Sequence, residues 1–201
     1  HRLIRRQRQM CIRDRNMFSE YSMLNPREMA EFFGFTEKEV QELCSKYDRS
    51  FEETKAWYNG YELSVVEAQK LKVYAMYNPK SVVDAMLSGI FDNYWNQTET
   101  YEALKAYICM NFDGLKDSVI KILAGDRVQI NTGTFSNDMT SFQSRDDILT
   151  LLVHLGYLSY HWPDKIVAIP NKEVSQEYVN AISTMDWNEV IHSVEASRKL
   201  L

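Results

Sequence analysis

The sequence predicts an α+β protein that is mostly α-helical and carries small β-hairpins. Two observations lead to this class. Capping residues precede most stretches in which apolar residues recur at helical spacing, and short β-rich stretches flank compact turns. The chain has 201 residues, of which 45% are hydrophobic. A chain of this length buries a sizeable core and suits one domain or two small ones.

Helix signals dominate residues 16–112. Helix-starting residues precede the expected helices: Asn25-Pro26, Thr36 with Glu39, Ser50 with Glu53, and Asn78-Pro79. The expected stops are Gly34, Asn59-Gly60 and Gly89, because glycine readily takes the left-handed conformation after a last helical turn. A further helix is expected over residues 99–110. Residues 61–63 and 73–77 are predicted to pair as a small hairpin around a polar insertion.

Residues 113–183 predict a different arrangement. Asp113 opens a helix, residues 128–130 indicate a strand, and Ser144 with Asp147 caps the next helix. Two strands, 157–162 and 166–169, follow around a Pro-Asp-Lys turn. Helix, strand, helix and hairpin in this order predict a winged-helix-like unit. A helix from Asn171 to about Ser183 comes next, and residues 184–201 are expected to begin a connecting helix capped by Asp186 with Glu189.

The first fifteen residues differ from the rest. Residues 5–15, RRQRQMCIRDR, have no helical or strand periodicity, and back-translation matches them to the linker and transposase end of a sequencing-library adapter. We therefore expect residues 1–15 to be a non-native, adapter-derived segment and exclude it from the fold prediction. The alternative is a basic amphipathic or targeting arm. The last expected helix reaches Leu201 without a capping residue. Together with the adapter-derived start, this suggests a chain that is truncated at both ends.

Charge and cysteine content restrict the function classes. Residues 1–15 hold six arginines and one acidic residue, so the net charge falls from −5 to −10 without them. An acidic chain repels phosphate backbones, which disfavours non-specific nucleic-acid binding. Cys44 and Cys109 lie in helix-like stretches and in no CxxC motif, as in a reducing compartment. No apolar run approaches membrane-spanning length, so we expect a cytoplasmic chain that makes no membrane contact.

Catalytic motifs are missing from the sequence. It contains no GxxxxGK phosphate loop and no HExxH, CxxC or GxSxG pattern. His154 and His161 are expected to be packed or solvated rather than metal-bound, and the acids at 146 and 147 are explained by a helix cap and dipole. We therefore predict no catalytic, cofactor-binding or metal-binding residue in this chain. The expected recognition helix, residues 145–155, carries a single arginine, so DNA readout is also disfavoured.

Large aromatic residues gather at the turn signals instead. The candidate contact residues are Trp57, Tyr58, Asn59, Gly60, Tyr61, Tyr77, Asn78, Pro79, Tyr94 and Trp95. One interpretation is a hydrophobic mini-core beneath the hairpin. The other is a docking surface for a domain outside this chain, because aromatic residues are enriched at interfaces.

A set of short motifs, which includes these aromatic residues, follows a fixed order along residues 22–201. They are Gly34-Phe35-Thr36 with Glu39-Val40, Trp57-Tyr58-Asn59-Gly60-Tyr61, Tyr77-Asn78-Pro79 with Ser81-Val82, Asn93-Tyr94-Trp95 with Thr98, Leu151-Leu152 with Gly156-Tyr157-Leu158, and Ile169-Pro170-Asn171 with Glu173-Val174. In order and spacing they resemble the bacterial AAA-ATPase-like proteins that often continue into a PD-(D/E)XK nuclease domain. Glu62 departs from the pattern, since a basic residue often follows that turn.

The resemblance implies a role for the chain as the helical lid bundle and winged-helix portion of such a protein. ATP and Mg²⁺ would bind upstream, in an N-terminal ATPase core, and any nuclease acids would lie in a C-terminal domain. These two domains are the expected partners, and nucleic acid would be a partner of the parent protein rather than of this segment. The alternative is a non-enzymatic protein-interaction or DNA-tethering module of a regulator.

Overall fold

The computed structural model describes residues 21–67, 69–95, 100–110, 112–135 and 142–183. The segment 1–15 and the helix expected after residue 184 lie outside the described residues. The described chain has a mixed α+β fold with two small antiparallel sheets of three strands each, which confirms the predicted class. Among the described residues, every helix is too short or too polar to cross a bilayer.

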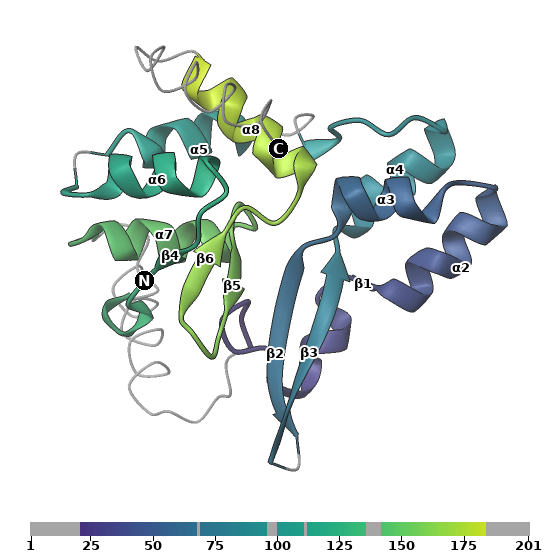
Figure 1. Ribbon diagram of the computed structural model, residues 1–201, viewed down its shortest axis with the longest axis horizontal. Coiled ribbons are helices and arrows are strands. Elements are labelled where there is room, and N and C mark those ends of the chain that lie inside the picture. The colour runs from purple at the N-terminus through teal and green to yellow at the C-terminus, as the bar shows by residue number, and fades with distance from the viewer. Residues whose placement is uncertain (1–20, 68, 96–99, 111, 136–141, 184–201) are drawn as a thin grey trace, which may run out of the picture.

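The first part of the chain places helices around a long hairpin (Figure 1). Its elements are the 3₁₀-helix η1 (Arg27–Phe32), β1 (Phe35–Thr36), α2 (Glu37–Tyr47), α3 (Phe51–Tyr58), β2 (Tyr61–Glu67), β3 (Lys70–Tyr77) and α4 (Pro79–Ser88). Thr36 and Glu39 form the predicted capping box, and Ser50 caps α3. Gly89 ends α4 with a φ of 74°, as expected of a glycine after a last helical turn.

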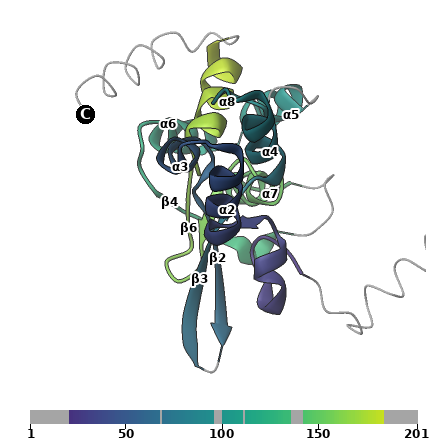
Figure 2. The same cartoon turned by 90° about the vertical axis from the view of Figure 1, so that its right-hand side faces the viewer.

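The β2–β3 hairpin is longer than predicted. The two strands pair continuously from Tyr61 opposite Met76 to Glu67 opposite Lys70, so the expected polar insertion is strand. The reason is an alternation of period two: Leu63 and Val65 are buried, while Val66 is exposed. β1 pairs with the other edge of β3, which gives the order β1-β3-β2. The tip of the hairpin extends beyond the helices in two perpendicular views (Figures 1 and 2).

The second part follows the predicted order of helix, strand, helix and hairpin. Its elements are α5 (Thr100–Ile108), α6 (Leu115–Leu123), β4 (Val128–Gln129), the 3₁₀-helix η3 (Thr132–Thr134), α7 (Arg145–His154), β5 (Ser159–His161), β6 (Ile166–Ala168) and α8 (Lys172–Ser183). β4 pairs with β6, so the sheet order is β4-β6-β5. Asp113 does not cap α6. The chain turns at Gly114, with a φ of 72°, and that residue occupies the cap position.

Three hydrophobic cores hold these elements together. The largest joins α5–α8 to the second sheet, another lies between α2, α3 and α4, and a small one lies beneath the β2–β3 hairpin. α5 falls within the predicted region 16–112, yet its Leu104 and Ile108 pack in the largest core. The domain boundary at residue 112 stays a prediction. We call the contact between residues 21–95 and residues 100–183 the seam.

Candidate functional site

The predicted contact residues gather where the hairpin meets the helices. Trp57 and Tyr58 end α3, and Asn59-Gly60 leads directly into β2. Because Tyr61 lies opposite Met76, the turn at residues 57–61 and the segment 77–79 are neighbours. Tyr94 and Trp95 follow α4. Tyr94 packs against the hydrophobic core between α2, α3 and α4, which also contains Tyr58 and Tyr77. Sequence spacing had predicted this side-by-side arrangement of the first two segments.

Three of the tyrosines are buried within this chain. Tyr58, Tyr61 and Tyr77 expose 0%, 6% and 1% of their surface. The Tyr58 hydroxyl donates to the Asp92 carbonyl oxygen at 2.9 Å. Burial raises the pKa of all three phenols, that of Tyr77 to about 12. These three side chains therefore match the mini-core interpretation and present no surface to another domain, whereas Trp57, Tyr94 and Trp95 are partly exposed.

Tyr61 also joins the two parts of the chain. Its hydroxyl donates a hydrogen bond of 2.7 Å to the carbonyl oxygen of Gly156. Trp95 packs against the Tyr157 ring, with centroids 5.7 Å apart. Gly60 lies against the backbone of Pro170: its φ is +130°, and a Cβ there would be 1.7 Å from the Pro170 carbonyl oxygen. Only glycine permits this approach, which brings the start of β2 next to the segment that enters α8.

A partly open cavity of about 220 Å³ lies at the seam. The residues that line it are Met23, Phe33, Tyr61, Leu63, Met76, Tyr77, Asn78, Pro79, Trp95 and Gly156. Half of them belong to the predicted contact set. The lining is apolar apart from the phenols, the Asn78 amide, the Trp95 indole N–H and backbone groups, and it contains no carboxylate, imidazole or ammonium group. The cavity suits an apolar side chain and offers no group for acid–base or nucleophilic chemistry.

Two buried glutamates behind this cavity were missed by sequence reasoning. Glu173 and Glu177 lie one turn apart on α8, and both are fully buried. The only sequence signal was that Glu173 belongs to the last motif of the resemblance. An acidic residue in a first helical turn ordinarily indicates a solvated, dipole-stabilised position, so burial was not expected. The predicted helix start is confirmed, since Asn171 Oδ1 accepts from the Val174 amide.

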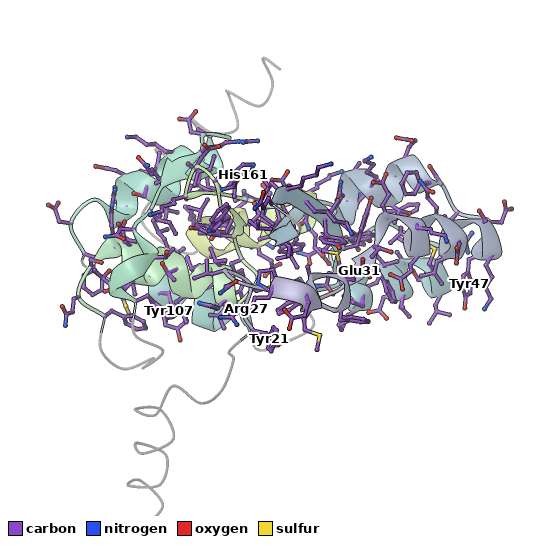
Figure 3. The ribbon with its side chains drawn as sticks, turned by 90° about the horizontal axis from the view of Figure 1, so that it is seen from below. Tyr21, Arg27, Glu31, Tyr47, Tyr107 and His161 are labelled. Atoms are coloured by element: carbon purple, nitrogen blue, oxygen red, sulfur yellow. The ribbon has the colours of Figure 1, made fainter. Side chains whose placement is uncertain are left out.

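The histidines and the α7 helix show no sign of a reactive site. His154 stacks on Phe135. His161, which is labelled in Figure 3, has ring nitrogens 3.9 Å from a Glu62 carboxylate oxygen and 3.4 Å from an Asp164 carboxylate oxygen. Within the described ranges, no three metal-ligating side chains come together. Every residue of α7 from Asp147 to Val153 is buried, and Arg145 binds Asp146 and Ser118. Residues 147–153 therefore present no face to a DNA groove, and within α7 only Arg145, Asp146 and His154 are partly exposed.

Comparison of the chain with protein-family models, with curated proteins and with solved structures gives no match in any of the three. The resemblance to the AAA-ATPase-like family therefore stays a prediction.

Proposed function

We propose that this chain is the non-catalytic lid and winged-helix portion of an AAA-ATPase-like protein, which couples the nucleotide state of an upstream domain to a following nuclease-like domain. The proposal starts from the ordered motifs of residues 22–201. One structural observation carries it further: the apolar cavity at the seam, which is lined by both parts of the chain and by half of the predicted contact residues.

The cavity supports a docking role for the seam. Its volume of about 220 Å³ suits one or two apolar side chains, and the partly exposed Trp95 lines it. Interfaces commonly anchor on an apolar side chain that fills such a pocket, with aromatic residues around it. In this proposal the ATPase core supplies that side chain, and docking depends on its nucleotide state.

The seam also supports a coupling role. Tyr61 binds Gly156, Gly60 lies against Pro170, and Lys172 Nζ lies 4.0 Å from the centre of the Trp57 ring. These contacts tie the β2–β3 hairpin and α3 to the end of α7 and to the start of α8. A displacement of the first part is therefore passed to α8, and through α8 to whatever follows residue 183.

The helix, strand, helix and hairpin of residues 115–168 support a winged-helix unit used for packing. The β4-β6-β5 order fits that unit, in which the first strand pairs with the last. Because α7 is buried, the unit is proposed to hold the seam and α8 rather than to read DNA. The alternative of a DNA-tethering module gains no support from this helix.

ATP and Mg²⁺ do not fit the residues of this chain. The sequence has no phosphate loop, the seam cavity lacks cationic groups, and no trio of metal ligands gathers in the described part of the chain. In the proposal, the nucleotide acts on this chain only through the docked ATPase core.

The gene from which the chain derives provides the first test. The proposal expects a GxxxxGK[ST] motif upstream of residue 16 and a D…ExK pattern downstream of residue 201 in the genomic sequence. An intact gene with neither motif would overturn it and favour the non-enzymatic interaction module.

A cavity-filling variant of the whole protein provides the second test. Met23→Trp places a large ring at the cavity, and we expect it to reduce ATP-dependent activity at least tenfold by blocking docking. Leu87→Trp, at an exposed position on α4, is the matched control and should leave that activity unchanged. Equal activities for the two variants would rule out the cavity as the docking site.

A further inference from the structure

The buried carboxylates of Glu173 and Glu177 hold the segment 92–95 against α8. Glu173 Oε1 accepts hydrogen bonds from the amides of Tyr94, at 2.8 Å, and Trp95, at 3.0 Å. Glu177 Oε1 accepts from the Asn93 side-chain amide. From the opposite side, the Tyr58 hydroxyl bonds the backbone of Asp92. The segment is thus clamped between α3 and α8.

Each carboxylate uses only one of its two oxygens in this clamp. Oε2 of Glu173 and Oε2 of Glu177 are buried and have no hydrogen-bond partner. The hydroxyl of Ser81 is buried and faces Glu173. A buried polar oxygen without a partner is costly, and more so when it carries charge. The ionised form of this pair is therefore poorly accommodated.

No cation within the described residues forms an ion pair with either carboxylate. Lys80 is the basic group that acts on Glu173, but its Nζ binds Asp84 at 2.8 Å and the Tyr94 carbonyl oxygen at 3.2 Å. Lys172, the neighbour in sequence, lies over the Trp57 ring. Without a paired cation, burial is the dominant influence on both carboxyls.

The other groups that face the pair do not titrate near neutral pH. Tyr58 on α3 and Tyr61 on β2 face Glu173, and burial raises the pKa of both phenols, so both stay neutral. Asn93 and Asn180, which face Glu177, carry no charge. α5 contributes Leu104 and Ile108 to the core that it shares with α8. Asp92 of the segment itself is exposed and accepts from the Asn93 amide. Among the described residues, Glu173 and Glu177 are thus the buried carboxyls in this part of the seam.

Burial raises the pKa of both carboxyls above the ordinary value of 4.5, against the smaller effect of their hydrogen-bond donors. The folded state therefore binds these protons more tightly than the unfolded or locally opened state. The stability gained from protonation is complete below the ordinary pKa and is lost as the pH rises through the raised values. Rising pH must weaken this contact.

We propose that Glu173 and Glu177 form a proton-dependent latch, which closes the segment 92–95 on α8 when the carboxyls are neutral and loosens it when they are ionised. Trp95 belongs to this segment, lines the seam cavity and packs on Tyr157. Opening of the latch therefore changes the shape of the cavity. The latch is independent of the proposed ATPase role, since it depends only on residues of this chain.

Hydrogen exchange of the Tyr94 and Trp95 amides, followed by NMR in the 201-residue chain, tests the latch directly. After correction for the intrinsic exchange rate, we expect the local opening equilibrium to rise about tenfold or more from pH 5 to pH 8. Glu173→Gln with Glu177→Gln should remove the pH dependence, because glutamine keeps an acceptor oxygen and carries no charge. Glu42→Gln, at an exposed position on α2, should retain it.

Amides of the β2–β3 hairpin, such as that of Val65, provide the internal control, because neither the segment 92–95 nor α8 belongs to the small core beneath the hairpin. Three results would overturn the latch: wild-type opening that does not change with pH, a double glutamine variant that keeps the full response, or an equal rise at Val65. Should the double variant fail to fold, Glu177→Gln alone retains the two backbone donors of Glu173 and should lose part of the response.

Discussion

The Tyr61 hydroxyl donates a hydrogen bond to the Gly156 carbonyl oxygen, 95 residues further along the chain. Tyr61 begins β2, and Gly156 follows the last turn of α7, so this bond ties the hairpin to the helix in the largest core. The tyrosine ring is almost completely buried. Contacts between residues so far apart in sequence fix the position of the two parts of the chain relative to each other.

Removal of that hydroxyl should destabilise the whole chain. Tyr61→Phe keeps the ring but leaves the Gly156 carbonyl oxygen without its partner, at a cost of about 1–3 kcal/mol. Urea unfolding of the 201-residue chain measures the change. Tyr47→Phe is the control, since Tyr47 is partly exposed, near the opposite end of the molecule from Tyr107 (Figure 3). A loss no larger than that of the control would show that the bond contributes little.

The close approach of Gly60 to Pro170 predicts a strong effect of a single methyl group. Gly60→Ala combines a φ of +130° with a Cβ that would overlap the Pro170 carbonyl oxygen, so we expect a loss above about 3 kcal/mol. Gly125→Ala has a comparable backbone strain at φ +94° but open space around its Cβ, and should cost about 1 kcal/mol. Thermal unfolding of both variants separates the clash from the strain, and equal losses would contradict the close contact.

Asp147 is a buried acid with a structural role. Its Oδ2 accepts from the amides of Gln143 and Ser144, and its Oδ1 accepts from the Thr134 hydroxyl. Asp147→Ala leaves these donors without an acceptor, and we expect a loss of about 2–4 kcal/mol. Asp117→Ala, at an exposed first-turn position of α6, should cost no more than about 1 kcal/mol. Similar losses in chemical denaturation would argue against a special role for Asp147.

Local signals predicted much of the fold. The capping boxes at Thr36 and Ser144, the stop at Gly89 and the helix start at Asn171 all depend on residues within four positions of each other. Such interactions join residues that are close together in the sequence, so the spacing of those residues reveals them. The extension of the hairpin past Leu63 was missed because the alternation breaks down towards the tip: Lys70 and Lys72 lie on the same face as Leu63 and Val65.

The site was less accessible to sequence reasoning. Spacing brought the turn at residues 57–61 next to residues 77–79, but Tyr61 is held by Gly156 and Tyr58 by Asp92, which lie far away in sequence. Glu173 and Glu177 gave no signal of burial, because a surface helix and a buried one can carry the same acidic residues. Only the packing of the segment 92–95 distinguishes the two cases.

The buried α7 helix predicts that the chain binds duplex DNA weakly. Its groups from Asp147 to Val153 are covered, and the chain carries a net charge of −5. Fluorescence anisotropy at physiological salt should give a dissociation constant no tighter than about 1 µM, with no preference among sequences. Tight, sequence-selective binding would instead support the DNA-tethering alternative.

Trp57 and Tyr58 distinguish docking from core packing, since the two aromatic side chains are adjacent but lie in different surroundings. Tyr58 is fully buried and bonds Asp92, so Tyr58→Ala should cost about 3–5 kcal/mol. Trp57 is partly exposed, and its clearest contact is the Lys172 ammonium over its ring, a type of interaction worth about 0.5–1 kcal/mol at exposed sites.

We therefore expect Trp57→Ala to cost the 201-residue chain about 1–2 kcal/mol, well below the loss for Tyr58→Ala, in urea unfolding followed by circular dichroism. The smaller loss for Trp57→Ala would mean that folding needs little of the Trp57 ring, so that the ring can contact another domain. In the whole protein, the docking proposal then requires Trp57→Ala to reduce nucleotide-dependent activity far more than this loss of stability explains. If Trp57→Ala instead unfolds the chain as readily as Tyr58→Ala, the ring belongs to the core and is not a docking residue.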